Sequence, residues 1–132
     1  MTYPHRLQFV LICLLGIALT ACATRTSTAS AAFPTGSYAR GEAVIRLNPD
    51  GTTVGTSLSG QDWSKGSYTV KGDTATFTDN WYADATEAPP CIGVAGTYRW
   101  TYANQQLLLE PIEDRYQARV NGFRGGAWMR MD

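Results

Sequence analysis

The sequence of 132 residues predicts an all-β domain of eight antiparallel strands, in a meander that closes into a barrel, preceded by a signal helix and a flexible tether. Three observations lead to this fold class. From residue 36 onward apolar and polar residues alternate with a period of two, turn-forming residues interrupt the pattern at short intervals, and no useful stretch shows the 3.6-residue period of a helix. An eight-stranded meander tends to close because closure removes exposed strand edges. The alternative is an open, flattened sandwich of the same strands.

The first predicted strand is long and joins Ser37–Arg40 to Glu42–Asn48 through a bulge at Gly41. The stretch Asn48-Pro49-Asp50-Gly51 predicts a turn, because proline presets φ and glycine accepts a positive φ. The second strand, Thr52–Leu58, is rich in β-branched residues.

A hairpin follows, made of strands Lys65–Lys71 and Thr74–Asp79 around the two-residue turn Gly72-Asp73. Its alternation places Tyr68 and Phe77 on the inward face of the barrel.

The segment Asn80–Val94 shows no periodicity, and long segments of this kind in compact domains are often binding loops. It contains Trp81 and Tyr82, and we expect Trp63 to lie in a loop as well. Because exposed aromatic side chains are enriched in contact hot spots, these three are candidate protein-contact residues. Alternatively, they plug the mouth of the barrel.

Four further strands complete the count: Ala95–Tyr102, Gln106–Glu110, Arg115–Val120 and Phe123–Met131. The last two flank Asn121-Gly122, the dipeptide that type I′ hairpin turns prefer.

The N-terminal segment has the pattern of a secretory signal. Arg6 precedes an uncharged apolar run, Phe9–Leu19, which is too short to span a bilayer. It ends in Leu19-Thr20-Ala21-Cys22, which resembles the lipobox of bacterial lipoproteins. The alternatives are an ordinary secretory signal with an incidental cysteine, or a short anchor helix. Residues 1–21 are thus expected to be a signal peptide and residues 22–35 a lipidated N-terminus and tether.

The lipobox resemblance implies cleavage between Ala21 and Cys22 and attachment of diacylglycerol, and usually a further palmitate-type acyl chain, to Cys22. Two or three chains anchor a protein stably, so the bilayer is the expected partner. Ala23 does not provide the aspartate that favours inner-membrane retention in Gram-negative lipoproteins. The expected location is therefore the cell envelope, at the outer membrane facing the periplasm in a Gram-negative host.

Composition excludes several functions. The precursor holds 11 basic and 11 acidic residues, and such a neutral chain predicts no nucleic-acid partner. The single histidine, His5, leaves with the signal, which excludes Ser-His-Asp, Cys-His and histidine-rich zinc sites from the mature chain. We expect no catalytic residue, no metal and no cofactor. Cys91 has no intramolecular disulfide partner, and a buried, inert thiol is favoured over a reactive or intermolecularly paired one.

Six short motifs occur along residues 36–132: Gly36-Ser37-Tyr38, Asn48-Pro49-Asp50-Gly51, Gly66-Ser67-Tyr68-Thr69-Val70, Gly72-Asp73-Thr74, Gly96-Thr97-Tyr98-Arg99-Trp100 and Trp128-Met129-Arg130. With these motifs the domain resembles the lipocalin-like (calycin) barrels of small bacterial lipoproteins and secreted proteins. The chain departs from the family where lipocalins usually have Gly-x-Trp and it has Tyr38, and where secreted members often carry a disulfide. The resemblance implies a barrel that encloses one small ligand.

Five aromatic residues fall on the inward faces of neighbouring predicted strands: Tyr68, Phe77, Tyr98, Trp100 and Tyr102. They line an apolar ligand cavity, or they are simply the core of a small barrel. The densest charge cluster is Glu110, Glu113, Asp114, Arg115 and Arg119, which is interpreted either as a solvated strand end or as an arginine clamp for a ligand carboxylate.

Three functions remain open at this point. The first is non-catalytic binding of a small apolar or amphipathic ligand inside the barrel. The second is binding of an envelope protein through the loop end, as small periplasmic barrels that inhibit proteases or lysozymes do. The third is a structural envelope role with no ligand.

Overall fold

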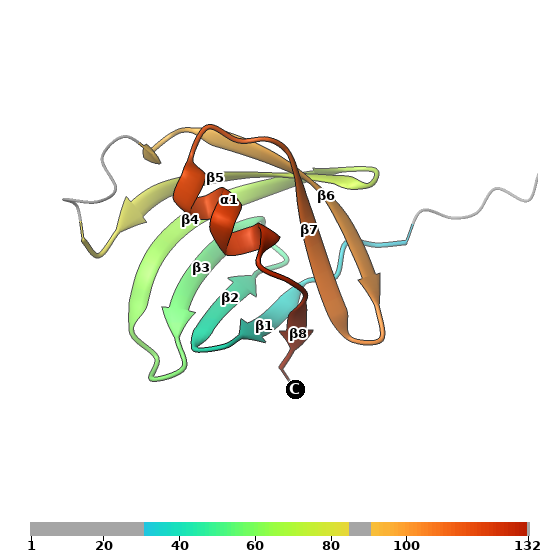
Figure 1. The fold of residues 1–132 in the computed structure, drawn as a ribbon, viewed down its shortest axis with the longest axis horizontal. Helices are drawn as coiled ribbons and strands as arrows, with labels where there is room; N and C mark the ends of the chain where they lie inside the picture. The colour runs from blue at the N-terminus through green and yellow to red at the C-terminus, as the bar shows by residue number, and fades with distance from the viewer. Residues whose placement is uncertain (1–30, 85–90, 132) are drawn as a thin grey trace, which may run out of the picture.

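The computed structural model describes residues 31–84 and 91–131, which form a closed barrel of eight antiparallel strands with one helix (Figure 1). The all-β, closed-meander fold class is therefore confirmed. The elements are β1 (Gly36–Arg40), β2 (Ala43–Leu47), β3 (Thr52–Ser57), β4 (Asp62–Lys71), β5 (Thr74–Tyr82), β6 (Ala95–Ala103), β7 (Gln106–Glu113), α1 (Gln117–Arg124) and β8 (Trp128–Arg130).

Each strand pairs with its neighbours in the sequence, and the short β8 closes the ring. It pairs with β1 through Tyr38↔Arg130 and with β7 through Leu107↔Trp128. This topology is consistent with the resemblance to lipocalin-like barrels.

The prediction of one long first strand is wrong. Gly41 does not form a bulge; Gly41 and Glu42 are a two-residue turn between β1 and β2, in register Arg40↔Ala43. Gly41 has φ +58, the left-handed conformation that a tight hairpin turn requires and that glycine adopts without steric cost.

The other turn predictions around these strands are confirmed. Asn48 accepts a hydrogen bond from the amide of Gly51 at 3.0 Å, which closes the predicted turn between β2 and β3. Gly72-Asp73 connects β4 and β5 as a two-residue hairpin, in register Lys71↔Thr74.

The predicted hairpin around Asn121-Gly122 is also wrong, because both residues lie inside α1. Helical spacing explains the difference: the side chains of Arg119, Val120 and Phe123 share one face of the helix and pack into the end of the barrel. Burial of this face overrides the local turn preference. The strand count still reaches eight, because the first predicted strand is two strands.

α1 lies against β7 and crosses one end of the barrel, in front of β3–β5 in Figure 1. We call this end the mouth. At the opposite end, the base, Phe33 packs against Tyr68 and Trp100 with ring centroids 5.2 and 5.3 Å apart. Between them lies an aromatic and aliphatic core: Tyr38, Ile45, Leu47, Tyr68, Ala75, Phe77, Tyr98, Trp100, Leu107, Leu109 and Trp128.

The predicted signal peptide, its cleavage site between Ala21 and Cys22, and the lipidated Cys22 lie outside the described residues. Among the residues that are described, no helix has the length and apolar character needed to cross a membrane.

Candidate functional site

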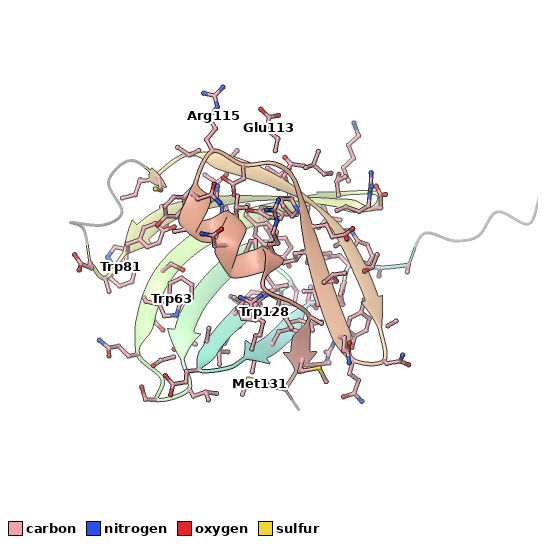
Figure 2. The ribbon with its side chains drawn as sticks, in the orientation of Figure 1. Trp63, Trp81, Glu113, Arg115, Trp128 and Met131 are labelled. Atoms are coloured by element: carbon pink, nitrogen blue, oxygen red, sulfur yellow. The ribbon has the colours of Figure 1, made fainter. Side chains whose placement is uncertain are left out.

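A partly open cavity of about 160 Å³ lies at the mouth, between α1, strands β1–β5 and the start of β8. Its lining is mostly apolar and rich in aromatic rings. The aromatic lining residues are Trp63, Phe77, Tyr82, Tyr116, Phe123 and Trp128, and the charged ones are Arg40, Asp79 and Arg119. Figure 2 shows Trp128 beneath α1, with Trp63 to one side over β3 and β4.

Trp63 belongs to β4 rather than to a loop, which corrects the sequence prediction. The register shifts at this point, since Gly55 pairs with Ser64 and Thr56 with Asp62, so Trp63 is the extra residue of a β-bulge. The bulge turns its ring toward Gly55, where a Cβ atom would lie 2.6 Å from the ring. Gly55 therefore makes the space that Trp63 occupies at the cavity wall.

Trp81 and Tyr82 were also predicted in a loop, and both lie at the end of β5. They point in different directions. Tyr82 lines the cavity and donates a hydrogen bond to Asp79 Oδ2 at 2.6 Å. Trp81 lies outside the cavity lining, 41% exposed, with the Lys65 ammonium 5.2 Å from its ring centre.

A buried ionic cluster of Arg119, Asp114 and Asp79 lies beside the cavity. Arg119 binds Asp114 with two hydrogen bonds of 2.6 and 2.9 Å, Asp79 with one of 2.7 Å, and the carbonyl of Val94 with one of 2.8 Å. The side chains are 5%, 0% and 10% exposed, respectively. Arg119 thus does act as a bidentate clamp, but its carboxylate comes from the same chain.

Protonation states in this cluster are fixed by its geometry. Burial lowers the pKa of Arg119, but the hydrogen bonds and charges of Asp114 and Asp79 outweigh burial and raise it. For Asp114, burial raises the pKa, while hydrogen bonds from Arg119, Tyr98 and the Tyr116 amide outweigh this and lower it. Arg119 and Asp114 therefore stay ionised and paired with each other.

The remaining members of the predicted charge cluster behave differently. Glu110, Glu113 and Arg115 are exposed, and Figure 2 shows Glu113 and Arg115 pointing away from the barrel. The interpretation as a solvated strand end holds for these three and is wrong for Asp114 and Arg119.

Of the five aromatic residues predicted to line a barrel cavity, Phe77 alone is part of the mouth cavity lining. Tyr68, Tyr98 and Trp100 are buried, and Tyr102 packs against the core. The polar side-chain atoms of the three buried residues form hydrogen bonds within the chain. Tyr68 donates to the carbonyl of Asn48 at 2.5 Å, Trp100 to that of Gly72 at 3.1 Å, and Tyr98 to Asp114. The middle of the barrel is therefore a packed core.

Trp128 is the lining residue with an unused polar group. Its side chain is 2% exposed, and within the described residues its Nε1–H is the buried side-chain donor that has no acceptor. The Arg40 guanidinium lies 4.4 Å from the ring centre and donates hydrogen bonds to the carbonyls of Gly122, Phe123 and Gly126. Arg40 thus joins the C-terminal end of α1 to the cavity wall.

Sequence reasoning missed Arg40, Asp79, Tyr116 and Trp128 as lining residues. A signal was present for α1: Tyr116, Arg119, Val120 and Phe123 recur at helical spacing. The strong turn preference of Asn121-Gly122 led to the prediction of a hairpin instead of this helix.

The thiol of Cys91 is free and buried, as expected. No group of three or more histidine, cysteine, aspartate or glutamate side chains that could hold a metal ion occurs within residues 31–84 and 91–131. Comparisons with protein-family models, with curated proteins and with solved structures find no match to this chain.

Proposed function

We propose that this chain is a non-catalytic lipoprotein of the bacterial cell envelope, anchored through acylated Cys22, whose lipocalin-like barrel binds a small apolar or amphipathic molecule. The observation that carries the binding proposal is the aromatic-lined cavity of about 160 Å³ at the mouth. It is close to the roughly 150 Å³ of an engineered apolar cavity that binds benzene, and below the roughly 300–1,000 Å³ of drug-sized pockets. The ligand is accordingly small.

The state of the charged groups supports a non-catalytic role. General acid–base catalysis needs a titratable side chain whose proton is free to move at the working pH. Beside the cavity, Arg119 is ion-paired with Asp79 and Asp114, and Arg40 is held by backbone carbonyls. These charges stabilise the mouth and leave the aromatic walls to make the contacts.

The described part of the chain begins at the end of the barrel opposite the cavity. Phe33 packs there against Tyr68 and Trp100. The start of the domain therefore lies away from the proposed ligand site.

Native mass spectrometry of the full lipoprotein, purified from its own membranes in mild detergent, tests both the anchor at Cys22 and the binding of a small molecule. We expect a mass that includes the acyl chains and a second, non-covalent small molecule that is released on collisional activation. Cys22→Ser should lack the acyl mass and leave the membrane fraction. Membrane attachment of Cys22→Ser as firm as that of the wild type would refute the anchor. A bare wild-type protein would refute the carried ligand.

A second candidate function, binding of an envelope protein, is favoured by the exposure of Trp63 (39%) and Trp81 (41%) on β4 and β5. Trp81→Ala separates the two candidates, because Trp81 lies outside the cavity lining. Loss of a cross-linked envelope partner with retained small-molecule binding would favour protein recognition. A structural role without a ligand is what would remain if neither a molecule nor a partner were found.

A further inference from the structure

We infer that the mouth cavity takes an uncharged ligand consisting of one aromatic ring with a hydrogen-bond acceptor; this inference rests on the proposed function and specifies its ligand class. Three properties of the cavity lead to it: its closed floor, its internally paired charged groups and the unused donor of Trp128.

The floor of the cavity excludes a long acyl chain. Phe77, Tyr98 and Phe123 pack against one another with ring centroids 4.8, 5.0 and 5.8 Å apart, between the cavity and the core of the barrel. A chain entering at the mouth would meet these rings. The volume of about 160 Å³ above them suits one planar ring, and aromatic walls favour stacked or edge-on contacts with such a ring.

The charged groups around the cavity already have partners within the chain. Arg119 binds Asp114 and Asp79, and Asp79 Oδ2 also accepts the hydrogen bond of Tyr82. Arg40 is held by the carbonyls at the end of α1. A cationic ligand would have to compete with Arg119 for Asp79, and an anionic ligand would have to draw Arg119 from its aspartates or Arg40 from its carbonyls. An uncharged ligand is therefore favoured.

Trp128 adds the requirement for an acceptor. Its ring lines the cavity, and its Nε1–H is buried without an acceptor among the described residues. Buried donors in proteins are nearly always paired, because an unpaired donor has lost its bonds to water and gained none. A ring nitrogen or carbonyl oxygen of a ligand at this wall would complete the pairing.

The test compares benzene with pyridine, which have the same shape and differ in one acceptor nitrogen. Both are titrated into the full-length lipoprotein in small nanodiscs at pH 8, where pyridine is neutral, while the tryptophan indole N–H signals are followed by NMR. We expect pyridine to shift the Trp128 signal downfield and benzene to leave its hydrogen bonding unchanged. Benzoate and benzylamine should bind at least tenfold more weakly than pyridine, because a charged ligand loses its hydration and must compete with the partners that already hold Arg119, Asp79 and Arg40.

Trp128→Phe keeps a ring and removes the donor. Because the variant also changes the cavity wall, the informative quantity is the difference between the two ligands: it should weaken pyridine binding about tenfold more than it weakens benzene binding. Trp100→Phe is the matched control, since its indole N–H is already bonded to Gly72 at the base of the barrel. That variant should bind pyridine as the wild type does. If one of the variants fails to fold, the chemical-shift response of Trp128 in the wild type still shows whether the ligand accepts its hydrogen bond.

The possible results distinguish failure of the inferred ligand class from failure of the proposed binding function. If benzene and pyridine both bind, with no response of Trp128 and no effect of Trp128→Phe, the acceptor requirement is overturned while small-ligand binding stands. If fatty acids bind and ring compounds do not, the ring-sized ligand class is overturned. If no small molecule binds and none co-purifies, both the inference and the proposed binding function fail.

Discussion

Replacing Arg119 with methionine should strongly destabilise the barrel. The variant keeps a long side chain but removes the cation that Asp79 and Asp114 share, together with four hydrogen bonds of 2.6–2.9 Å. Removing one partner of a buried ion pair costs about 3–5 kcal/mol, because an uncompensated charge stays buried. A domain of this size has a total stability of about 5–15 kcal/mol, so we expect the Tm to fall by roughly 12–40 °C.

The pH dependence of this variant provides an independent check. In the wild type the pKa of Asp114 is lowered, so its stabilising contribution is present at neutral pH and is lost as the pH falls below about 4. Without Arg119, burial is no longer outweighed and the pKa of Asp114 should rise above that of the unfolded chain. The variant then gains stability on acidification, and its deficit relative to the wild type should narrow between pH 7 and pH 4.5.

Urea denaturation of both proteins at pH 7 and pH 4.5 measures these differences. Arg99→Met is the matched control, because Arg99 pairs with Asp73 at 3.4 Å in an exposed position where both side chains are more than half accessible. It should cost no more than about 1 kcal/mol. A loss below 1 kcal/mol for Arg119→Met, or a deficit that does not change with pH, would refute the reasoning that a buried ionic cluster holds the mouth together.

Two further substitutions test the local geometry. Gly96→Ala should destabilise by about 1–3 kcal/mol in urea denaturation, because its Cβ would overlap the carboxylate of Asp114 and lie 2.8 Å from Arg119 Nη2; an unchanged midpoint would contradict this packing. Gln105→Gly should stabilise by about 0.5–1 kcal/mol, since Gln105 has φ +62 in the turn between β6 and β7, where glycine avoids a steric cost; a lower Tm in calorimetry would argue against this conformation.

The alternation of apolar and polar residues and the turn motifs were sufficient to predict much of the barrel. The alternation in β4 and β5 predicted buried Tyr68 and Phe77, and Gly72-Asp73 predicted their hairpin. These predictions succeed because hairpins are local: the turn fixes the register, and a period of two fixes which face is buried. The same reasoning failed at Gly41, because one glycine is compatible with a bulge and with a tight turn, and only the pairing of β1 with β2 distinguishes them.

The mouth shows what sequence pattern could not predict. Asn121-Gly122 has a strong local preference for a hairpin turn, yet it lies in α1, because Phe123 and Arg119 gain partners on β5, β6 and β8. Asp79 and Arg119 are 40 residues apart in the chain, and no spacing rule relates them. The cavity is formed by α1, strands β1–β5 and Trp128 of β8, so it exists only after the barrel closes.

The sequence by itself determined the fold class and the burial of Tyr68, Phe77, Tyr98 and Trp100, because these follow from composition and from interactions between neighbours in the chain. The strand count of eight agreed because two errors cancelled: the first predicted strand is two strands, and the predicted strand Arg115–Val120 lies largely in α1. The sequence also provides the whole basis for the proposed anchor at Cys22, which is a local motif. Only the tertiary structure decided that the centre of the barrel is packed, that the candidate site lies at the mouth, and that Trp128 borders it with an unused donor. The physical reason is that cavities, buried ion pairs and unsatisfied donors are properties of side chains brought together from distant positions, and their energies depend on burial that no local segment has alone.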